Sequence, residues 1–236
     1  MTDTSARERP AAVSLGILGG TFNPPHLGHL AVARHAREEL GLERVLLVPT
    51  HTTPHKAGGR GGAGAQGGRD PGPEHRLRMC ELAVRDEDGL SASAIEIERG
   101  GLSYTVDTLT ALHESHPQAQ LTFIVGADTA STLASWREPE RLLELADLAV
   151  AARAGAERER VLDALAALQL GRGVRGERRN AADGVRFLEM PTIDVSSSMV
   201  RDRVAAGEAV EGLVGPAVAG YIAAHGLYRA RAEALQ

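Results

Sequence analysis

Residues 19–29 read Gly-Gly-Thr-Phe-Asn-Pro-Pro-His-Leu-Gly-His. An apolar run from Val13 to Leu18 precedes it, and a helical pattern follows from Gly28 to Leu40. The pattern predicts a strand, a tight turn and a helix. Glycines let the backbone approach an anion closely, and the free N–H groups of a first helical turn point at it. The segment therefore predicts a phosphate-binding loop.

Two histidines strengthen this interpretation. His26 and His29 are three residues apart, so in a first helical turn their side chains share a face and can donate to one polyphosphate. The stretch matches neither Gly-x-Gly-x-x-Gly nor Gly-x-x-x-x-Gly-Lys-Ser/Thr. Glycines alone would favour an ordinary strand–helix turn, with Gly and Pro as turn residues.

A second segment, residues 193–201, supports the first. It reads Ile-Asp-Val-Ser-Ser-Ser-Met-Val-Arg and opens a helix after a strand-like run. Ser196 and Ser197 are good N-cap residues that leave N–H groups free for an anion. Arg201 lies one turn later and can fork onto phosphate oxygens. Taken alone, the segment is more typical of a serine-capped helix with a solvent arginine, because Ser is a leading N-cap residue.

Composition excludes several classes of protein. The net charge of −5 provides no basic field for nucleic acid. Cys80 is alone, so one chain can form neither a disulfide nor a thiolate zinc site. No apolar run is long enough to cross a membrane, and the first twelve residues lack a signal peptide's apolar region. We therefore expect a cytoplasmic protein that binds neither nucleic acid nor membranes.

Lys56 is the only lysine among the 26 basic residues. Its retention in an arginine-rich chain favours a role for a compact, flexible ammonium group, although a surface lysine kept by chance is the alternative. The stretch 57–72 follows with eight glycines, and we expect a loop insertion that can act as a lid. An RNA-binding Arg-Gly segment is disfavoured because no aromatic residue is present to stack on bases. Residues 171–179 predict a solvated basic loop.

Strand-like runs alternate with amphipathic helices along the chain, which predicts an α/β fold with a mostly parallel sheet covered by helices on both faces. One domain is expected over 13–228, between a flexible N-terminus, 1–12, and a tail, 229–236. The expected strands are Val13–Leu18, Arg44–Val48, Ala92–Ile97, Leu121–Val125, Leu148–Ala152 and Val185–Met190. The expected helices include Gly28–Leu40, Pro73–Arg85, Tyr104–His113, Arg141–Leu145 and Glu157–Leu168, with others from Ser197 and Pro216.

Three further segments carry candidate ligand contacts. Residues 98–109 break at two glycines and open a helix with the hydroxyls of Ser103 and Thr105. A strand ends in Gly126-Ala-Asp128, where a carboxylate can bind ribose or simply cap a helix. The only tryptophan, Trp136, can stack on an aromatic ligand or pack in the core.

The first two motifs resemble the Gly-x-Phe-x-Pro-x-His-x-Gly-His and Ile-Ser-Ser-Thr-x-x-Arg signatures of the nucleotidyltransferase superfamily. The likeness extends to the bacterial nicotinate-nucleotide adenylyltransferase family over about residues 13–228. It is carried by residues 53–56, 103–109, 126–128, 136, 214–216, 221–222 and 225–228. The departures are Asn23, where many members carry Asp, Ser198 for Thr, Arg137 for an aromatic residue, and the glycine-rich insertion.

The resemblance implies a Rossmann-like nucleotidyltransferase that joins the AMP moiety of ATP, with Mg²⁺, to nicotinate mononucleotide. It implies catalytic roles for His26, His29 and Arg201. It implies ATP contacts by Gly19, Gly20, Thr21, Phe22, Gly126, Asp128, Ser196 and Ser197. It implies acceptor contacts by Asn23, Lys56, Ser103, Tyr104, Thr105 and Trp136.

Alternatives to this function stay open. The chain could transfer a nucleotide to another phosphorylated acceptor, such as phosphopantetheine, or could be a non-catalytic nucleotide-binding regulator. Four histidines, His26, His29, His51 and His55, could form a metal site by count. No carboxylate or thiolate stands at ligand spacing, however, so we expect no metal held by the protein. Assembly into a homo-oligomer is compatible with the sequence.

Overall fold

The structure is a computed structural model that describes residues 13–54, 70–152, 156–166, 168, 185–190 and 193–229. Several features expected from the sequence lie outside these residues: the N-terminus 1–12, Lys56, residues 57–69 of the glycine-rich stretch, the basic segment 171–179 and the tail from 230 onward. Among the described residues, no helix is long and apolar enough to span a membrane.

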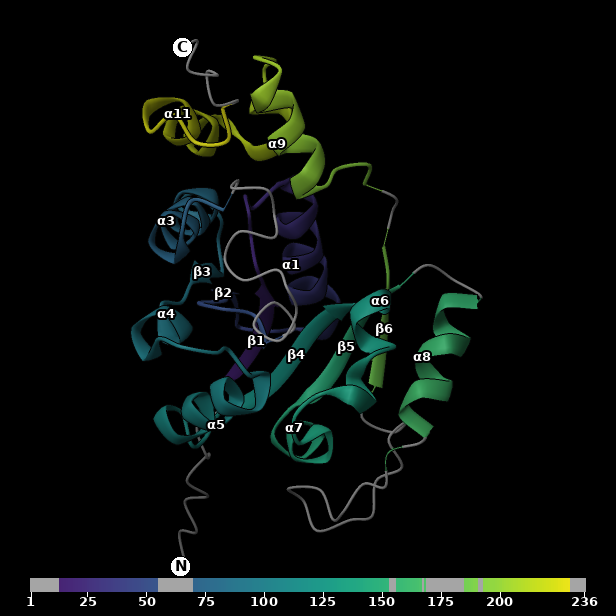
Figure 1. Cartoon of the computed structure of the whole chain (residues 1–236). Coiled ribbons are helices and arrows are strands. Elements are labelled where there is room, and N and C mark those ends of the chain that lie inside the picture. The colour runs from purple at the N-terminus through teal and green to yellow at the C-terminus, as the bar shows by residue number, and fades with distance from the viewer. Residues whose placement is uncertain are drawn as a thin grey trace, which may run out of the picture.

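Six strands of the described part of the chain form one parallel sheet in the order β3-β2-β1-β4-β5-β6 (Figure 1). The strands are β1 Ser14–Gly20, β2 Arg44–Pro49, β3 Leu90–Ala92, β4 Gln120–Gly126, β5 Asp147–Ala152 and β6 Val185–Glu189. The order reverses direction between β1 and β4, and the crevice beyond such a reversal is where open parallel sheets bind ligands. The carboxyl ends of β1, β2 and β4 therefore lead directly into the candidate site.

Helices cover both faces of this sheet. They are α1 Leu27–Leu40, α3 Pro73–Val84, α4 Ile95–Arg99, α5 Thr105–Ser115, α6 Ala127–Ala130, the 3-10 turn η1 Leu133–Ser135, α7 Pro139–Leu145, α8 Ala156–Ala166, α9 Ser197–Ala205, α10 Glu211–Val214 and α11 Pro216–Ala224.

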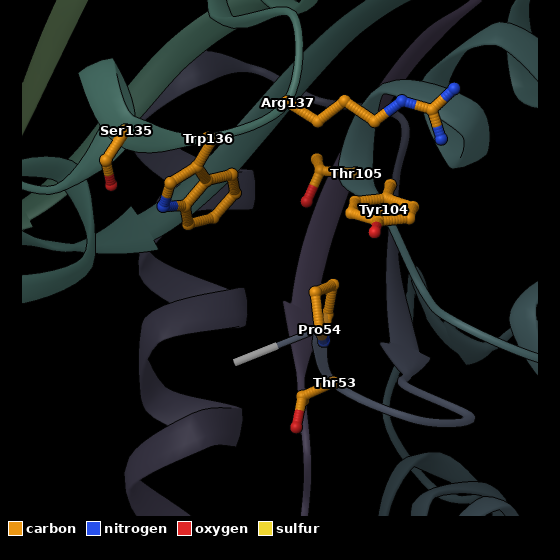
Figure 2. A pocket seen from close by; sticks show the side chains of 7 residues that line it. All are labelled: Thr53, Pro54, Tyr104, Thr105, Ser135, Trp136 and Arg137. Carbon is orange, nitrogen blue, oxygen red and sulfur yellow. The ribbon is translucent and has the colours of Figure 1, made fainter. Parts of the chain in front are cut away.

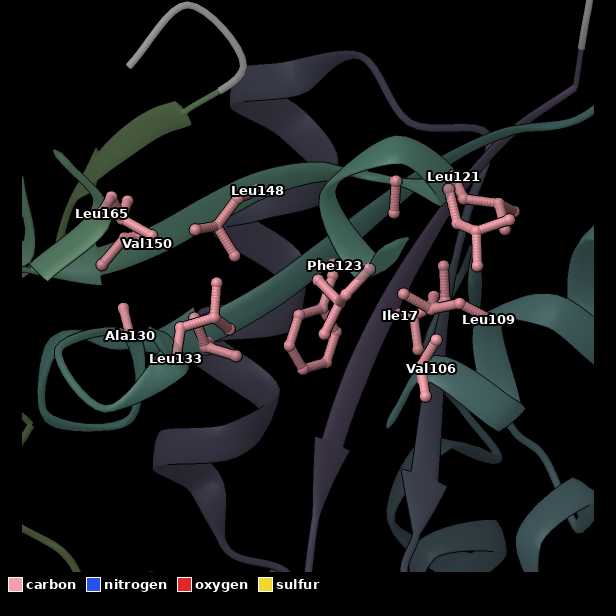
Figure 3. Packing of buried hydrophobic residues seen from close by; sticks show 14 of the residues in the cluster. Ile17, Val106, Leu109, Leu121, Phe123, Ala130, Leu133, Leu148, Val150 and Leu165 are labelled. Atoms are coloured by element: carbon pink, nitrogen blue, oxygen red, sulfur yellow. The ribbon is translucent and has the colours of Figure 1, made fainter. Parts of the chain in front are cut away.

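Successive residues of the central strands point to opposite cores. Phe123 packs with α5, α7 and α8 on one face (Figure 3), whereas Ile124 packs with α1 and α3 on the other. Ile17 and Leu18 of β1 divide in the same way. A strand buried on both faces reads as a continuous apolar run, which is why these strands were identifiable from the sequence.

The last helices form a third core beside the sheet. Val200, Val214, Val218 and Ile222 pack against Met79 of α3. This unit, α9 to α11, lies over the amino-terminal end of α1 in Figure 1. It places the chain's final described residues next to the phosphate-binding loop.

The predicted fold class is confirmed, and the predicted strand Ala92–Ile97 is wrong. The strand is shorter and earlier, Leu90–Ala92, and residues 95–99 form the helix α4. Glu96 of this helix is only 5% exposed, and its Oε1 accepts a hydrogen bond from the Thr108 hydroxyl at 2.6 Å. This contact joins residues 12 positions apart, so the sequence pattern of residues 92–97 cannot reveal it. It favours a helix there over a strand.

Candidate functional site

The phosphate-binding loop follows β1, which ends at Gly20. A side chain at position 20 would approach the Phe22 ring at 3.2 Å, and Phe22 itself has a positive φ of 48°. Phe22 is buried, and its ring packs edge-on against His29 with centroids 4.8 Å apart. Gly19, Gly20, Thr21 and Phe22 thus form a tight turn that leads to the start of α1.

Both predicted histidines lie at the amino terminus of α1. His26 is the N-cap residue, and its backbone N–H donates to Nδ1 of His29 at 3.2 Å. The two rings stack with centroids 3.7 Å apart. Glycine fits position 28 without displacing the histidine, because a side chain there would meet His26 Nδ1 at 3.0 Å.

Burial keeps this histidine pair neutral. Burial lowers the pKa of His26 from 6.5 to about 4. It lowers the pKa of His29 to about 3, with a further contribution from the neighbouring His26. Because His29 Nδ1 accepts a hydrogen bond, its neutral ring carries the proton on Nε2. The side chain is therefore a neutral N–H donor.

Helix α9 contacts the same loop. Ser197 donates from its hydroxyl to the Pro24 carbonyl at 2.8 Å, and Arg201 donates from Nη1 to the Asn23 carbonyl at 2.7 Å. Ser196 caps α9 by accepting from the Met199 N–H at 3.2 Å. The structure thus brings the second sequence motif against the first.

Two buried nitrogen atoms near the loop lack a protein partner among the described residues. They are Nδ1 of His26 and Nε of Arg201. Buried polar atoms are normally hydrogen-bonded, so unsatisfied nitrogens in a binding loop favour an external ligand. Histidines, an arginine and the first N–H groups of two helices together suit a polyphosphate.

A second region lies beside the first, at the start of α5. A cavity of about 460 Å³ is lined by Thr53, Pro54, Tyr104, Thr105, Ser135, Trp136 and Arg137 (Figure 2). Trp136 and Tyr104 supply its aromatic walls from opposite sides. The Trp136 indole packs edge-on toward Phe123, with centroids 6.0 Å apart, and its N–H donates to the Thr132 hydroxyl at 3.1 Å.

Arg137 lies at the edge of this cavity and contacts two residues at the start of α5. Its guanidinium lies 4.8 Å from the centre of the Tyr104 ring and pairs with the Asp107 carboxylate at 3.4 Å. This contact joins the segment that carries Trp136 to the first turn of α5. It also places a positive charge at the cavity.

Thr105 and Ser103 have different surroundings. Thr105 lines the cavity as the first residue of α5, where the leading N–H groups have no partner within the helix. Ser103 is 7% exposed, and its hydroxyl accepts from the His51 N–H at 2.9 Å. The Ser103 side chain is therefore used within the protein rather than as a wall of the cavity.

The predicted ribose contacts lie at the carboxyl end of β4. Gly126 ends the strand, and a side chain there would meet no atom within 4 Å. Asp128 is exposed in the first turn of α6 and is not the N-cap residue of that helix, which is Gly126. Both remain available to a ligand. Lys56, the remaining predicted contact, lies outside the described residues.

Two structural contacts were missed by sequence reasoning. Arg76 of α3 is 2% exposed and donates to the Thr21 carbonyl at 2.8 Å. Tyr228 is buried, and its hydroxyl donates to Asn23 Oδ1 at 2.8 Å. Burial raises the pKa of Tyr228, so the hydroxyl stays protonated. In the sequence, Tyr228 belongs to the family likeness but carries no predicted role.

Comparisons with known proteins show the family to which the chain is similar. The model of the cytidylyltransferase-like family matches residues 17–203. A protein of Thermomicrobium roseum named probable nicotinate-nucleotide adenylyltransferase is 40% identical over 216 residues, covering 91% of each chain. A protein of the same name from Desulfitobacterium hafniense is 37% identical over 215 residues, covering 91% of this chain and 95% of its own.

The fold is shared with solved structures of low identity. Plasmodium falciparum nicotinic acid mononucleotide adenylyltransferase, complexed with NaAD, superposes with a TM-score of 0.66 at 18% identity. The match covers 91% of this chain and 97% of that one. A complex of the same enzyme with APC gives a TM-score of 0.65 at 17% identity, over 91% of this chain and 96% of that one.

Proposed function

This chain belongs to the cytidylyltransferase-like family, and from that premise we propose that it is a nicotinate-nucleotide adenylyltransferase. It joins the AMP moiety of ATP to nicotinate mononucleotide and releases pyrophosphate. The observation that carries this proposal is that two binding regions of different chemistry lie side by side at the carboxyl edge of the sheet. One is the phosphate-binding loop with its two histidines, and the other is the aromatic cavity at the start of α5.

The proposed reaction is an in-line displacement. A phosphate oxygen of the mononucleotide forms a bond to the α-phosphorus of ATP. The bond from that phosphorus to the oxygen bridging to the β-phosphorus breaks, and pyrophosphate leaves with the electron pair. The attacking phosphate is already ionised at neutral pH, so no general base is needed. Catalysis then depends on positioning and on stabilising charge at the phosphoryl oxygens.

The loop residues supply that stabilisation in our proposal. His29 donates from Nε2 to a phosphoryl oxygen, and the neighbouring His26 faces the same phosphates. Arg201 adds a full positive charge from α9 while its Nη1 stays on the Asn23 carbonyl. Burial keeps both histidines neutral in the ligand-free protein, and a neutral imidazole still donates one N–H to a phosphoryl oxygen.

The cavity suits the nicotinate ring. Trp136 offers an indole face, and the first N–H groups of α5, together with the Thr105 hydroxyl, suit a carboxylate. Tyr104 closes the other side. We assign Gly126 and Asp128 to the adenosine ribose, and Lys56 to the phosphate of the mononucleotide.

Magnesium fits this site only as part of the ATP complex. The described residues contain no group of three or more His, Cys, Asp or Glu side chains that could hold a metal ion. The side chains around the loop are mainly nitrogen donors, which suit phosphate better than Mg²⁺. We propose that phosphate oxygens and water hold the ion, with the protein binding the phosphates. Cytoplasmic location and homo-oligomer formation stay predictions.

A side-by-side assay tests the function. The purified protein is incubated with MgATP and, separately, nicotinate mononucleotide, nicotinamide mononucleotide or phosphopantetheine, and dinucleotide and pyrophosphate are measured. We expect at least a tenfold preference in kcat/KM for the acid over the amide, about 1.4 kcal/mol, because helix N–H groups favour a carboxylate. Faster turnover of phosphopantetheine would support the rival acceptor, and absence of pyrophosphate with every acceptor would exclude catalysis.

A further inference from the structure

Arg76 is a buried arginine that contacts two separate backbone segments and one carboxylate. From α3 its Nη1 donates to the carbonyls of Thr21 at 2.8 Å and Thr50 at 2.6 Å. Its Nη2 donates to the His51 carbonyl at 3.0 Å, and Nε donates to the Asp70 carboxylate at 3.1 Å. Its side chain is 2% exposed. One guanidinium thus binds the loops that follow β1 and β2.

These hydrogen bonds fix the direction of whole peptide groups. In a planar trans peptide, the N–H of one residue points opposite to the carbonyl of the residue before it. Holding the Thr21 carbonyl therefore turns the Phe22 N–H away from Arg76. Holding the Thr50 carbonyl turns the His51 N–H outward, and that N–H donates to the Ser103 hydroxyl at 2.9 Å.

The two loops belong to different halves of the candidate site. Thr21 lies in the phosphate-binding loop. Residues 50–52 lead directly to Thr53 and Pro54, which line the aromatic cavity. The Ser103 N–H donates in turn to the Thr52 carbonyl at 2.8 Å, beside the cavity-lining Tyr104. A single side chain therefore connects the backbone of both halves.

We propose that Arg76 is a positioning residue shared by the two substrate-binding halves of the site. In this proposal Arg76 contacts neither substrate. It sets the backbone orientation of the phosphate-binding loop, which faces ATP, and of the cavity wall, which faces the acceptor. This inference rests on the proposed function. A guanidinium suits the role because its donors form a planar fork that reaches several carbonyls at once, whereas an ammonium is a point charge.

Arg76→Lys tests the proposal with the charge retained. We expect kcat/KM to fall about tenfold or more for ATP and for nicotinate mononucleotide, because both loops lose carbonyl contacts. The matched control is Arg78→Lys, the same change two residues later on α3. Arg78 is 55% exposed and pairs with Glu81, so its kinetics should match those of the unaltered protein.

Asp70→Asn separates carbonyl positioning from ion pairing. The Asp70 carboxylate is 26% exposed, and the three carbonyl contacts of Arg76 do not involve it. We expect its kcat/KM values to stay within about threefold of normal. Losses as large as those of Arg76→Lys would overturn the assignment to the carbonyl contacts.

Binding and melting measurements complete the test. Trp136 lines the acceptor cavity, so its fluorescence reports mononucleotide binding without turnover, and titration calorimetry reports ATP binding. Weaker binding of both substrates by a folded Arg76→Lys protein supports the proposal. A lowered Tm with normal binding and kinetics overturns it, and so does failure of both Arg76→Lys and Arg76→Gln to fold. If the unaltered protein forms no dinucleotide, the proposed function fails first, and that result is separate from these.

Discussion

The backbone N–H of His26 donates to Nδ1 of His29 across 3.2 Å, while the two imidazole rings stack 3.7 Å apart. This hydrogen bond selects one tautomer of His29. The ring must keep Nδ1 free of hydrogen to accept the bond, so Nε2 carries the proton. The helix start thereby fixes both the position and the donor atom of the second histidine.

The tautomer predicts unequal effects of two amide substitutions at position 29. The terminal nitrogen of Gln reaches the place of Nε2, whereas Asn is too short and mimics only Nδ1. We expect His29→Asn to lower kcat by about 10² or more, the scale of losing one donor to developing charge. His29→Gln should retain more activity. Equal losses, or greater activity in the Asn variant, would contradict the assigned donor, and single-turnover rates decide the matter.

The buried histidines also predict acid sensitivity of the fold. Their folded pKa values of about 4 and about 3 lie below the ordinary value of 6.5. Below pH 6.5 the unfolded chain therefore binds more protons than the folded chain. The free energy of unfolding should be largest above pH 6.5 and should fall as the pH drops toward the folded values.

Thermal melting between pH 8 and pH 5 measures this effect. The double variant His26→Gln with His29→Gln should show a shallower decline in Tm across that range. His116→Gln, at an exposed position before β4, is the matched control and should keep the normal slope. An unchanged slope in the double variant would show that other groups control the acid response.

Tyr228→Phe tests the link between the chain's end and the phosphate-binding loop. Loss of the hydroxyl removes the hydrogen bond to Asn23 Oδ1 inside the protein. We expect the free energy of unfolding to fall by about 1–2 kcal/mol, as for a buried hydrogen bond. KM for ATP should rise several-fold, because Arg201 binds the carbonyl of the same Asn23. Destabilisation with a normal KM for ATP would limit Tyr228 to a stabilising role.

Lys56 provides a prediction from composition alone. If the sole lysine binds the acceptor phosphate, Lys56→Arg should raise KM for the mononucleotide although the charge is kept. Lys56→Ala should cost more, about 1.5–3 kcal/mol for a charged hydrogen bond. KM for ATP should stay nearly constant in both variants. Steady-state kinetics with each substrate varied separately measure this, and normal values throughout would make Lys56 an ordinary surface residue.

The sequence predicted those parts of the site that are contiguous along the chain. The strand, the turn and the histidine pair of residues 19–29 are local, and their geometry follows from residue type and spacing. The contact between Arg201 and the Asn23 carbonyl was not predicted, although both residues were proposed for the site. It depends on how α9 returns to the sheet after 178 residues.

Arg76 shows why the rest could not be predicted. Arg76 and Arg78 lie on one helix and look alike in the sequence, yet Arg76 is 2% exposed and Arg78 is 55% exposed. The difference is set by the loops after β1 and β2, which surround one arginine and not the other. Ser103 is the reverse case. The sequence predicted that its hydroxyl contacts the ligand, but in the structure this hydroxyl accepts a hydrogen bond from the His51 N–H.

The hydrogen bond from Tyr228 to Asn23 spans 205 positions. During synthesis on the ribosome, the phosphate-binding loop emerges early, and Tyr228, which contacts Asn23 of that loop, emerges 205 residues later. The nascent chain can form the sheet long before it can form a finished nucleotide site. A premature stop after α9 would therefore leave a chain with its central strands intact and no competence to bind ATP tightly.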